Sequence, residues 1–350
     1  MKELYAGNAA NIADRILEVA EEIKANDSCI LVFPHKSVDG DCIGSSCAAV
    51  SIFRALGAKA WVAMPEALPE NMSFMGVEDL LFYPDEAFFA SGVVNGITNT
   101  EVMSVDCSEG HRMGPNGDYF DKASGKHLSI DHHEVTHLIN DYRWIEPKAS
   151  SASELVFYAA VAVADKSGID LVSIIDSRAA KCLLTGIVTD TGRFTYQNTN
   201  PETLEVAGQL MELGGDISTV CYNLFDRKKP QEFMISNTAC VNAQFLCDGR
   251  FAITVVTEEM FKQFNATTDD IADVVSRLRD IDGVDLAVVL REAGGGVIRG
   301  NLRSTEAVDC TLLAGAFGGG GHKRASGFSV DGGDIEEIKN KVIEKAQILL

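Results

Sequence analysis

Aspartate and histidine recur directly after apolar runs at four places in the sequence. These places are His35-Lys36-Ser37-Val38-Asp39-Gly40-Asp41, Val105-Asp106, Asp131-His132-His133 and Thr189-Asp190. Neutral imidazole and carboxylate oxygen together suit a borderline divalent metal. A single aspartate at a strand end is more often a turn or a helix cap, and for Asp39 or Asp190 alone that alternative is the better one. Coincidence is the weaker explanation for four such places together with two suitably spaced histidines.

The charges of these side chains favour two metal ions over one. The candidate metal ligands are His35, Asp39, Asp41, Asp106, His132 and Asp190. Four carboxylates packed together repel one another strongly without compensation. Two divalent cations balance them, and two metals about 3.5–4 Å apart form the usual clamp of phosphoryl chemistry. One ion alone leaves net negative charge facing an anionic substrate, so we expect a binuclear site.

Alternating strands and helices are expected to position these residues. The apolar patterns predict helices over 10–25, 43–56 and 152–164, and strands over 29–33, 58–63, 102–105 and 127–130. This order is typical of a parallel sheet covered on both faces. The apolar segment 182–188 before Asp190 fits a strand or a helix equally well. Because the carboxyl ends of parallel strands lie along one edge, we expect the candidate ligands to converge there.

A second domain is expected after the composition changes at Gly214-Gly215. We expect a metal-binding domain over 1–214, a helical linker over 215–236 and a smaller α/β domain over 237–350. The last begins with a hairpin around Asp248-Gly249. Its further predicted elements are strands at 285–290, 297–303 and 326–330, with helices near 309–316 and at the C-terminus. The fold class is therefore α/β, with the active site expected in the cleft between the two domains.

The second domain also carries a glycine run, Gly318 to Gly321, followed by His322-Lys323-Arg324. Successive glycines such as Gly319, Gly320 and Gly321 can present backbone N–H groups as a concave anion nest. Arg303 precedes them, and its fork geometry suits a phosphate. The alternative is a flexible loop with solvated basic side chains. Arg112, beside His111, could reach a phosphate across the cleft, but an exposed loop arginine is an equal alternative.

Composition limits the partners and the compartment. A net charge of −21 argues against a broad grip on long nucleic acid, although a small anionic substrate needs only a local positive pocket. The nine cysteines form no CxxC pair and are odd in number, which indicates reduced thiols in the cytoplasm. Charged residues within the N-terminal apolar rhythm exclude a signal peptide. The longest apolar run, 155–164, is about half of a membrane span. We expect a cytoplasmic protein without a membrane partner.

These motifs resemble the four motifs of the DHH phosphoesterase superfamily. The stretch from Gly318 to Gly327 is similar to the glycine-rich motif of its DHHA1 domain. The resemblance runs from residue 35 to residue 327 in the family's order. Length and motif set look most like the nanoRNase and pAp phosphatase group. Val38 and Thr136 depart from it, since proline and asparagine are common there.

The resemblance implies a role for each motif residue. His35, Asp39 and Asp106 would hold one metal, and Asp41, Asp106, His132 and Asp190 the other, with Asp106 bridging. The usual metal in this family is manganese. Asp131 would orient an imidazole, and His133 would face the scissile phosphate as a donor and as the acid for the leaving oxygen. Arg303 and His322 resemble the residues that grip the substrate nucleotide.

The activity implied by the resemblance is hydrolysis of very short RNA to nucleoside 5′-monophosphates by a hydroxide that two metals activate. Removal of the 3′-phosphate from pAp (3′-phosphoadenosine 5′-phosphate) is a second activity on the same site. An alternative is hydrolysis of cyclic or linear dinucleotides, such as cyclic di-AMP or pApA. A pyrophosphatase is disfavoured by the glycine-rich motif, and a non-catalytic nucleotide sensor by the complete ligand set. Long duplexes are not expected to fit, and a homodimer is left open.

Overall fold

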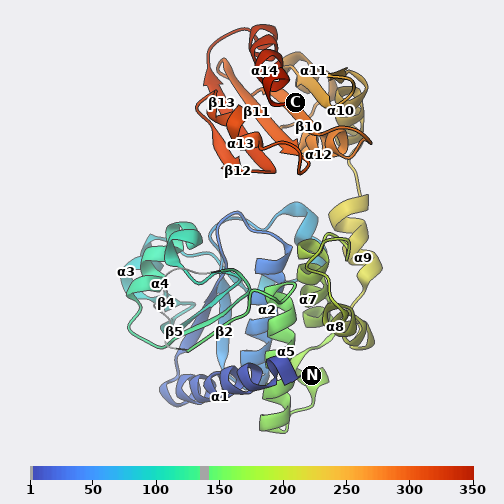
Figure 1. Cartoon of the computed structure of the whole chain (residues 1–350). Coiled ribbons are helices and arrows are strands. Elements are labelled where there is room, and N and C mark those ends of the chain that lie inside the picture. Colours follow the sequence, from blue (N-terminus) through green and yellow to red (C-terminus); the bar gives the residue numbers. More distant parts are fainter. Residues whose placement is uncertain (1–2, 135–141) are drawn as a thin grey trace. The chain divides into compact units, whose positions relative to one another are not determined.

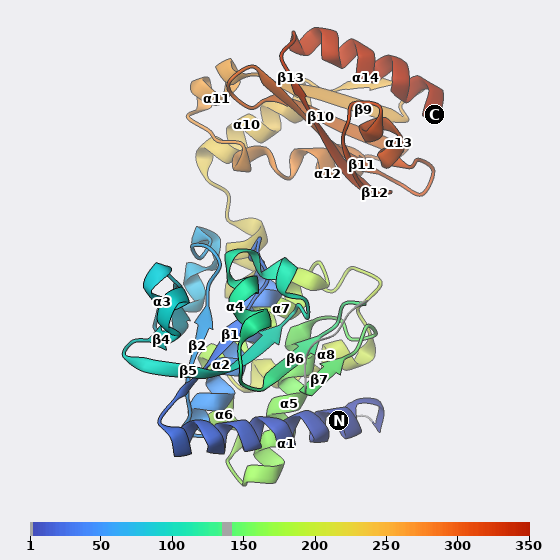
Figure 2. The same cartoon turned by 90° about the vertical axis from the view of Figure 1, so that its left-hand side faces the viewer.

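The computed structural model describes residues 3–134 and 142–350 of the chain. The chain divides into two compact units, Met1–Arg227 and Lys228–Leu350, and each is described by itself (Figures 1 and 2). The segment expected as a linker contributes α9 (Ile217–Cys221) and the π-helical turn η4 (Tyr222–Asp226) to the first unit. The next helix, α10 (Pro230–Val241), belongs to the second unit.

A parallel sheet forms the centre of the first unit, in the order β3-β2-β1-β5-β6-β7. Its strands are β1 (Cys29–Phe33), β2 (Lys59–Ala63), β3 (Leu81–Phe82), β5 (Ile97–Val105), β6 (His127–Asp131) and β7 (Tyr142–Ile145); β4 (Val93–Val94) pairs antiparallel with β5. All five residues of β1 are buried, and so are those of β6. Burial on both faces explains why β1 appears in the sequence as a continuous apolar run.

Helices cover both faces of this sheet. One face carries α1 (Glu3–Asn26), α2 (Gly40–Ala55), α5 (Ala152–Ser167), α7 (Ser177–Asp190) and α8 (Pro201–Glu212). The other carries α3 (Glu86–Ser91) and α4 (Gly117–Lys122). Shorter helical pieces are η1 (Glu70–Met75), η2 (Glu78–Leu80), η3 (Gly110–Asn116) and α6 (Leu171–Ile174). The expected parallel sheet with covered faces is therefore confirmed.

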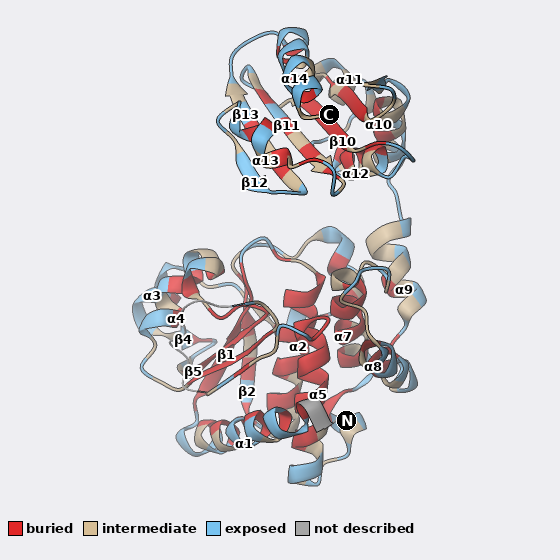
Figure 3. Cartoon of the chain, in the orientation of Figure 1, coloured by how far each residue is buried: buried red, intermediate tan, exposed pale blue. Residues whose placement is uncertain are grey.

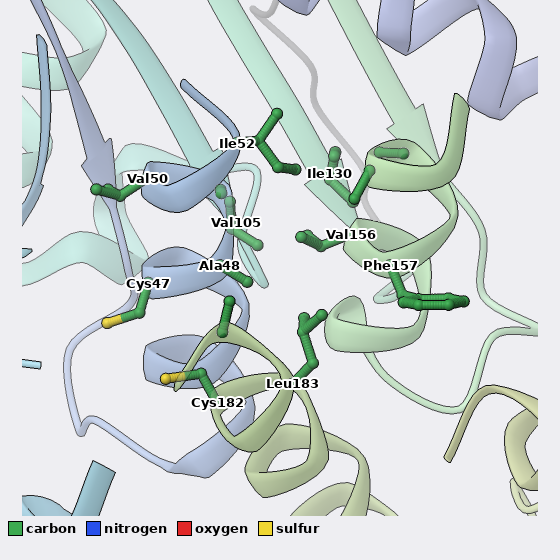
Figure 4. Close-up of a cluster of buried hydrophobic side chains, with 14 of the residues drawn as sticks. Cys47, Ala48, Val50, Ile52, Val105, Ile130, Val156, Phe157, Cys182 and Leu183 are labelled. Carbon is green, nitrogen blue, oxygen red and sulfur yellow. The ribbon is translucent and has the colours of Figure 1, made fainter. Parts of the chain in front are cut away.

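The larger core of the first unit lies between the sheet and the helices α2, α5 and α7, whose ribbons are mostly buried (Figure 3). Figure 4 shows Val105 and Ile130 of the sheet beside Ile52, Val156 and Leu183 of the helices. The segment 182–188 thus belongs to helix α7, which settles the alternative that the apolar pattern leaves open. Asp190 is the last residue of that helix and does not follow a strand.

The second unit contains a mixed six-stranded sheet in the order β12-β13-β11-β10-β9-β8. Its strands are β8 (Gln244–Leu246), β9 (Phe251–Val256), β10 (Leu286–Glu292), β11 (Val297–Ser304), β12 (Gly320–His322) and β13 (Ala325–Asp331). Its remaining helices are α11 (Glu258–Phe264), η5 (Asp269–Ile271), α12 (Val274–Arg279), α13 (Cys310–Gly315) and α14 (Ile335–Leu349). The expected hairpin joins β8 to β9.

Two small cores flank the second sheet. One lies between its strands and the helices α13 and α14, and the other between β9, β10 and the helices α10 and α12. The expected α/β class is confirmed for this half of the chain as well. Throughout the described residues, none of the helices has both the length and the apolar character needed to cross a membrane.

Candidate metal centre

The loop from β1 to α2 and the first turn of α2 present His35, Asp39 and Asp41 at one end of the parallel sheet. Asp39 caps α2, because its Oδ1 accepts hydrogen bonds from the backbone N–H groups of Asp41 and Cys42 at 3.1 and 3.0 Å. Nδ1 of His35 lies 2.7 Å from the carbonyl oxygen of Lys36. A histidine that donates one ring N–H to a carbonyl keeps its other nitrogen available for a metal. That nitrogen, Nε2, lies 3.4 Å from Oδ2 of Asp39.

Asp106 lies between the two candidate histidine ligands. Its Oδ2 is 3.3 Å from Nε2 of His35, and its Oδ1 is 3.3 Å from Nε2 of His132. The residue follows β5 with φ at 61°, a left-handed conformation that aspartate tolerates better than most residues. Its backbone N–H donates to the carbonyl of Ile130 on the neighbouring strand. One carboxylate thus faces both histidines, the arrangement expected of a bridging ligand.

His132 also faces the aspartates of two helices. Its Nε2 lies 3.1 Å from Oδ2 of Asp190 and 3.8 Å from Oδ2 of Asp41. Its Nδ1 lies 3.4 Å from the carbonyl oxygen of Ala149, again on the side away from the carboxylates. The structure therefore gathers all six candidate ligands at one site, although Asp190 arrives from a helix end.

Asp41 is completely buried, and the N-terminus of α5 accommodates its charge. Its two oxygens accept backbone N–H groups of Ala152 at 2.7 Å and Ser153 at 2.9 Å. Such N–H groups carry the positive end of the helix dipole. Burial nevertheless raises the pKa of Asp41, and the nearby carboxylates of Asp106 and Asp190 raise it further. A cation beside Asp41 would therefore offset the cost of its buried charge.

Two unsatisfied buried atoms show that the site fits a cation. Oδ1 of Asp106 and Nε2 of His132 are both buried, and neither has a hydrogen-bond partner in the described part of the chain. Leaving buried polar atoms unpaired is costly. A divalent ion between them satisfies both, and the surrounding oxygens and imidazoles are the ligand types that manganese and similar metals accept. The residues present therefore fit the group that the motifs imply.

Cys42 lies beside His35 and Asp39, close enough for one ion to contact all three. No spacing in the sequence distinguishes Cys42 from the other cysteines. Its thiol closes the cap of α2, accepting from the N–H of Asp39 at 3.4 Å and donating to the carbonyl of the same residue at 3.6 Å. Burial raises the pKa of Cys42 to about 12. A metal binds the thiolate, so we assign Cys42 to helix capping and not to the ligand set.

Asp131 and His133 form a second, adjacent arrangement. Oδ1 of the fully buried Asp131 accepts the backbone N–H of His133 at 3.0 Å and lies 2.8 Å from its Nδ1. Its Oδ2 accepts a hydrogen bond from the hydroxyl of Ser108 at 2.9 Å, and none of the sequence motifs predicts this contact. Nδ1 of His133 lies 3.5 Å from Oδ1 of Asp106, and its side chain is 39% exposed. A buried carboxylate thus orients an imidazole that is accessible to a substrate.

Arg112 lies in η3, next to the loop that carries His35. Its carbonyl oxygen accepts the backbone N–H of Lys36 at 2.7 Å, which fixes the two segments side by side. Its side chain is partly buried. A phosphate contact from this position stays a prediction. Thr136, where the sequence departs from the motif pattern, lies outside the described residues.

Arg303 and His322 lie in one row of the second sheet. Arg303 of β11 stands directly opposite Ala325 of β13, which stands directly opposite His322 of β12. Directly opposite residues of antiparallel strands point to the same face of a sheet. The two basic side chains therefore flank a single small alanine on one face.

The anion-nest interpretation is wrong for Gly318 and Gly319. Their N–H groups donate to the carbonyl oxygens of Gly315 and Ala314, so they close the end of α13. Gly319 must be glycine for a packing reason, because a Cβ there would lie 2.2 Å from the carbonyl oxygen of Gly327. Arg324 also has a structural role, since its guanidinium donates hydrogen bonds to the carbonyl oxygens of Thr305 and Val308. Gly320 and Gly321 lie in β12, and their substrate role stays a prediction.

Comparison with family models assigns both halves of the chain. Residues 29–187 match the N-terminal domain of the DHH family, and residues 248–347 match the DHHA1 domain. The first match contains all of the candidate metal ligands except Asp190, which lies three residues beyond its end. The second contains Arg303 and His322.

Individual proteins resemble the chain over most of its length. A Thermus thermophilus protein named bifunctional oligoribonuclease and PAP phosphatase NrnA is 29% identical over 328 residues, 93% of this chain and 91% of that protein. Its Bacillus subtilis namesake is 27% identical over 319 residues, 89% of this chain and 92% of that protein. The crystal structure of an exopolyphosphatase-related protein from Bacteroides fragilis superposes with a TM-score of 0.80 at 26% identity. That match covers 95% of this chain and 96% of the other.

Proposed function

The chain belongs to the DHH phosphoesterase family, and we propose that it hydrolyses short RNA oligonucleotides to nucleoside 5′-monophosphates. The observation that carries this proposal is the cluster around Asp106, where four carboxylates and two imidazoles converge with two buried atoms unsatisfied. The oligoribonuclease and PAP phosphatase relatives, similar over about nine tenths of the chain, support the substrate class. Removal of the 3′-phosphate from pAp is proposed as a second activity on the same site.

Two divalent ions, manganese by preference, are proposed for the centre. His35, Asp39 and Asp106 would hold one, and Asp41, Asp106, His132 and Asp190 the other. Bound ions of this kind neutralise phosphate oxygens and lower the pKa of water to near neutrality. The support is the ligand chemistry of the cluster and the two faces of the Asp106 carboxylate.

The proton for the leaving oxygen is proposed to come from His133. Asp131 holds Nδ1 of this imidazole, so that Nε2 lies on the opposite side of the ring. A carboxylate in that position stabilises the protonated imidazole and fixes its orientation, as in catalytic pairs of acid and orienting group. The exposed edge of His133 then donates to the oxygen that leaves phosphorus.

Substrate contacts are proposed for Arg303, His322, Gly320, Gly321 and Arg112. A guanidinium and an imidazole on one sheet face suit the phosphate of a short strand. The net charge of −21 disfavours a long duplex, which needs many phosphate contacts. The nine cysteines form no disulfide in the structure, and a cytoplasmic location is proposed from them. A homodimer stays open.

Turnover on a panel of substrates tests the proposal. Purified protein with manganese would be given pAp, pApA, cyclic di-AMP and RNA from two to five nucleotides, with Asp106→Asn protein in parallel. We expect nucleoside monophosphates from the short RNA, AMP from pAp, and no product from the variant. Faster turnover of cyclic di-AMP or pApA than of any RNA would replace the proposal with the dinucleotide alternative. No turnover of any substrate would refute a hydrolytic role.

A further inference from the structure

A second group of arginines lies on the same sheet face as Arg303. Along β11, Arg299, Asn301 and Arg303 alternate with the buried Ile298, Gly300 and Leu302. Alternate residues of a strand point to the same face. The three polar side chains therefore form a stripe, and Arg299 lies about 13 Å along the strand from Arg303 at about 3.3 Å per residue.

The register adds a further arginine to this stripe. Arg291 of β10 stands directly opposite Arg299, so two cations face each other across neighbouring strands. Like charges in directly opposite positions destabilise a sheet. None of the ion pairs in the described part of the chain involves either residue. Nε of Arg291 is buried and lacks a hydrogen-bond partner among the same residues.

The surroundings leave these charges unbalanced. Burial lowers the pKa of Arg291, the neighbouring Arg299 lowers it further, and the carboxylate of Asp269 opposes both effects. The apolar core on this face is built from β9, β10, α10 and α12, and within the described residues it takes no side chain from β11, β12 or β13. The arginine pair therefore lies beside this apolar core and outside it.

A hollow lies at this position. It has a volume of about 470 Å³, and its lining includes Arg291, Arg299, Asn301, Gly327 and Ser329. Ser329 and Gly327 stand directly opposite Arg299 and Asn301 on β13, so small residues border the arginines on that side. The hollow offers space for a phosphodiester group. Two guanidinium groups and an amide can donate hydrogen bonds to its oxygens.

We propose that Arg291 and Arg299 form a second phosphate site, which holds a phosphate of an oligonucleotide whose other phosphate is gripped near Arg303. The separation along β11 exceeds that between the two phosphates of a single nucleotide. The arginine pair therefore favours oligonucleotides over pAp. The preference for substrate length would then be determined by residues of the second unit. This inference rests on the proposed function for its substrate class.

The test compares the full chain with Arg299→Ala and with the control Lys341→Ala. Lys341 is half-exposed on α14, whose buried residues pack with the core on the opposite face, and its loss removes the same charge. We expect Arg299→Ala to lower the ratio of kcat/KM for pentanucleotide RNA to kcat/KM for pAp about tenfold, equivalent to about 1.4 kcal/mol. The control should leave that ratio unchanged. An unchanged ratio in Arg299→Ala would overturn the proposal.

A binding measurement distinguishes the proposed second phosphate site from the proposed hydrolytic activity. Fluorescence anisotropy with a labelled phosphorothioate pentanucleotide measures affinity without turnover, at several salt concentrations. Arg299→Ala should reduce the slope of log Kd against log salt by about 0.7, the value for one lost contact to a single strand. Arg299→Lys should keep the slope and lose affinity, because it retains charge without the fork. An unaltered slope in Arg299→Ala refutes the site even if the chain hydrolyses RNA, and an altered slope supports it even if the chain does not.

Discussion

Oδ1 of Asp106 lies 3.3 Å from Nε2 of His132, and both atoms are buried without a hydrogen-bond partner in the described part of the chain. The other oxygen of the same carboxylate lies 3.3 Å from His35. A single residue thus connects the two halves of the candidate metal centre. Most of the chemistry proposed for the chain depends on this position.

Asp106→Asn should nearly abolish turnover and should lower metal occupancy. An amide offers one oxygen and an N–H₂ group, so it cannot face both histidines as an acceptor. The loss of several kcal/mol of charge stabilisation predicts a fall in kcat of about three orders of magnitude. Metal content per chain and kcat would be measured together. Asp118→Asn on the exposed surface of α4 is the matched control, and near-full turnover of Asp106→Asn with both metals bound would sink the assignment.

His133→Ala should affect substrates according to their leaving group. Loss of a general acid costs about 10²–10⁴-fold on RNA, whose leaving oxygen needs a proton. A p-nitrophenyl phosphodiester has a leaving group that departs without one, so its turnover should fall much less. Asp131→Asn should show the same contrast more weakly, because the imidazole remains but loses its orienting carboxylate. Equal losses on both substrates would remove His133 from the role of acid.

Metal binding should release protons. Burial disfavours the charged form of His132, but Asp106 and Asp190 outweigh it and raise the pKa to about 11 in the metal-free protein. Against the same burial effect, Asp106 and Asp39 raise the pKa of His35. Both imidazoles are therefore in the positively charged imidazolium form at neutral pH without metal. A metal ion binds only the neutral ring.

The affinity for manganese should consequently rise with pH, since each bound imidazole must lose its proton first. Titration calorimetry in buffers of different protonation enthalpy measures the number of protons released, and we expect about one from each histidine. Binding heats that are independent of the buffer would contradict the assignment of these two ligands.

Arg303→Ala should weaken turnover of oligonucleotides far more than that of a small artificial phosphodiester. A charge-assisted hydrogen bond contributes about 1.5–3 kcal/mol, which predicts a loss of about ten- to a hundredfold in kcat/KM on RNA. Arg324→Ala provides the contrast, because its guanidinium binds backbone carbonyls of the same unit. That variant should lower the melting temperature and leave the ratio between the two substrates unaltered. Equal losses on both substrates in Arg303→Ala would refute its gripping role.

Gly44→Ala should destabilise the first unit although alanine is the better helix former. A Cβ at Gly44 of α2 would lie 2.2 Å from the backbone carbonyl oxygen of Cys182 on α7. Forced separation of packed helices costs about 1–3 kcal/mol in the free energy of unfolding. Gly208→Ala on the exposed side of α8 meets no atom within 4 Å and should stabilise by about 0.5–1 kcal/mol. Denaturant unfolding of both variants checks the pair, and a stabilised Gly44→Ala would contradict the packing.

Much of the candidate site could be predicted because strands that are buried on both faces contain apolar residues that are easily recognised in the sequence. β1 is a continuous apolar run, and the last five residues of β5 and all of β6 are buried. His35 and Asp106 follow β1 and β5, and Asp131-His132-His133 stands at the end of β6. Parallel strands bring such ends to one edge. Residue type and chain order were therefore enough to group these ligands and to identify the family.

The predicted anion nest is wrong at Gly318 and Gly319 for a local reason. Glycines permit many backbone conformations, so their number in a row does not say which partners their N–H groups will have. In the structure the end of α13 takes the N–H groups of Gly318 and Gly319. A helix end leaves unpaired carbonyls that must be satisfied, and the adjacent glycines satisfy them.

The sequence alone determined the types and the order of the candidate ligands, and its local apolar patterns indicated the sheet edge at which three of the four motifs meet. Tertiary structure decided the remainder. An apolar run of seven residues fits a strand or a helix, and only packing of α7 against α2 placed Asp190 at a helix end beside His132. Asp41 depends on N–H groups of Ala152 and Ser153, more than a hundred residues away. Contacts at that separation form only in the folded chain, so no local pattern contains them.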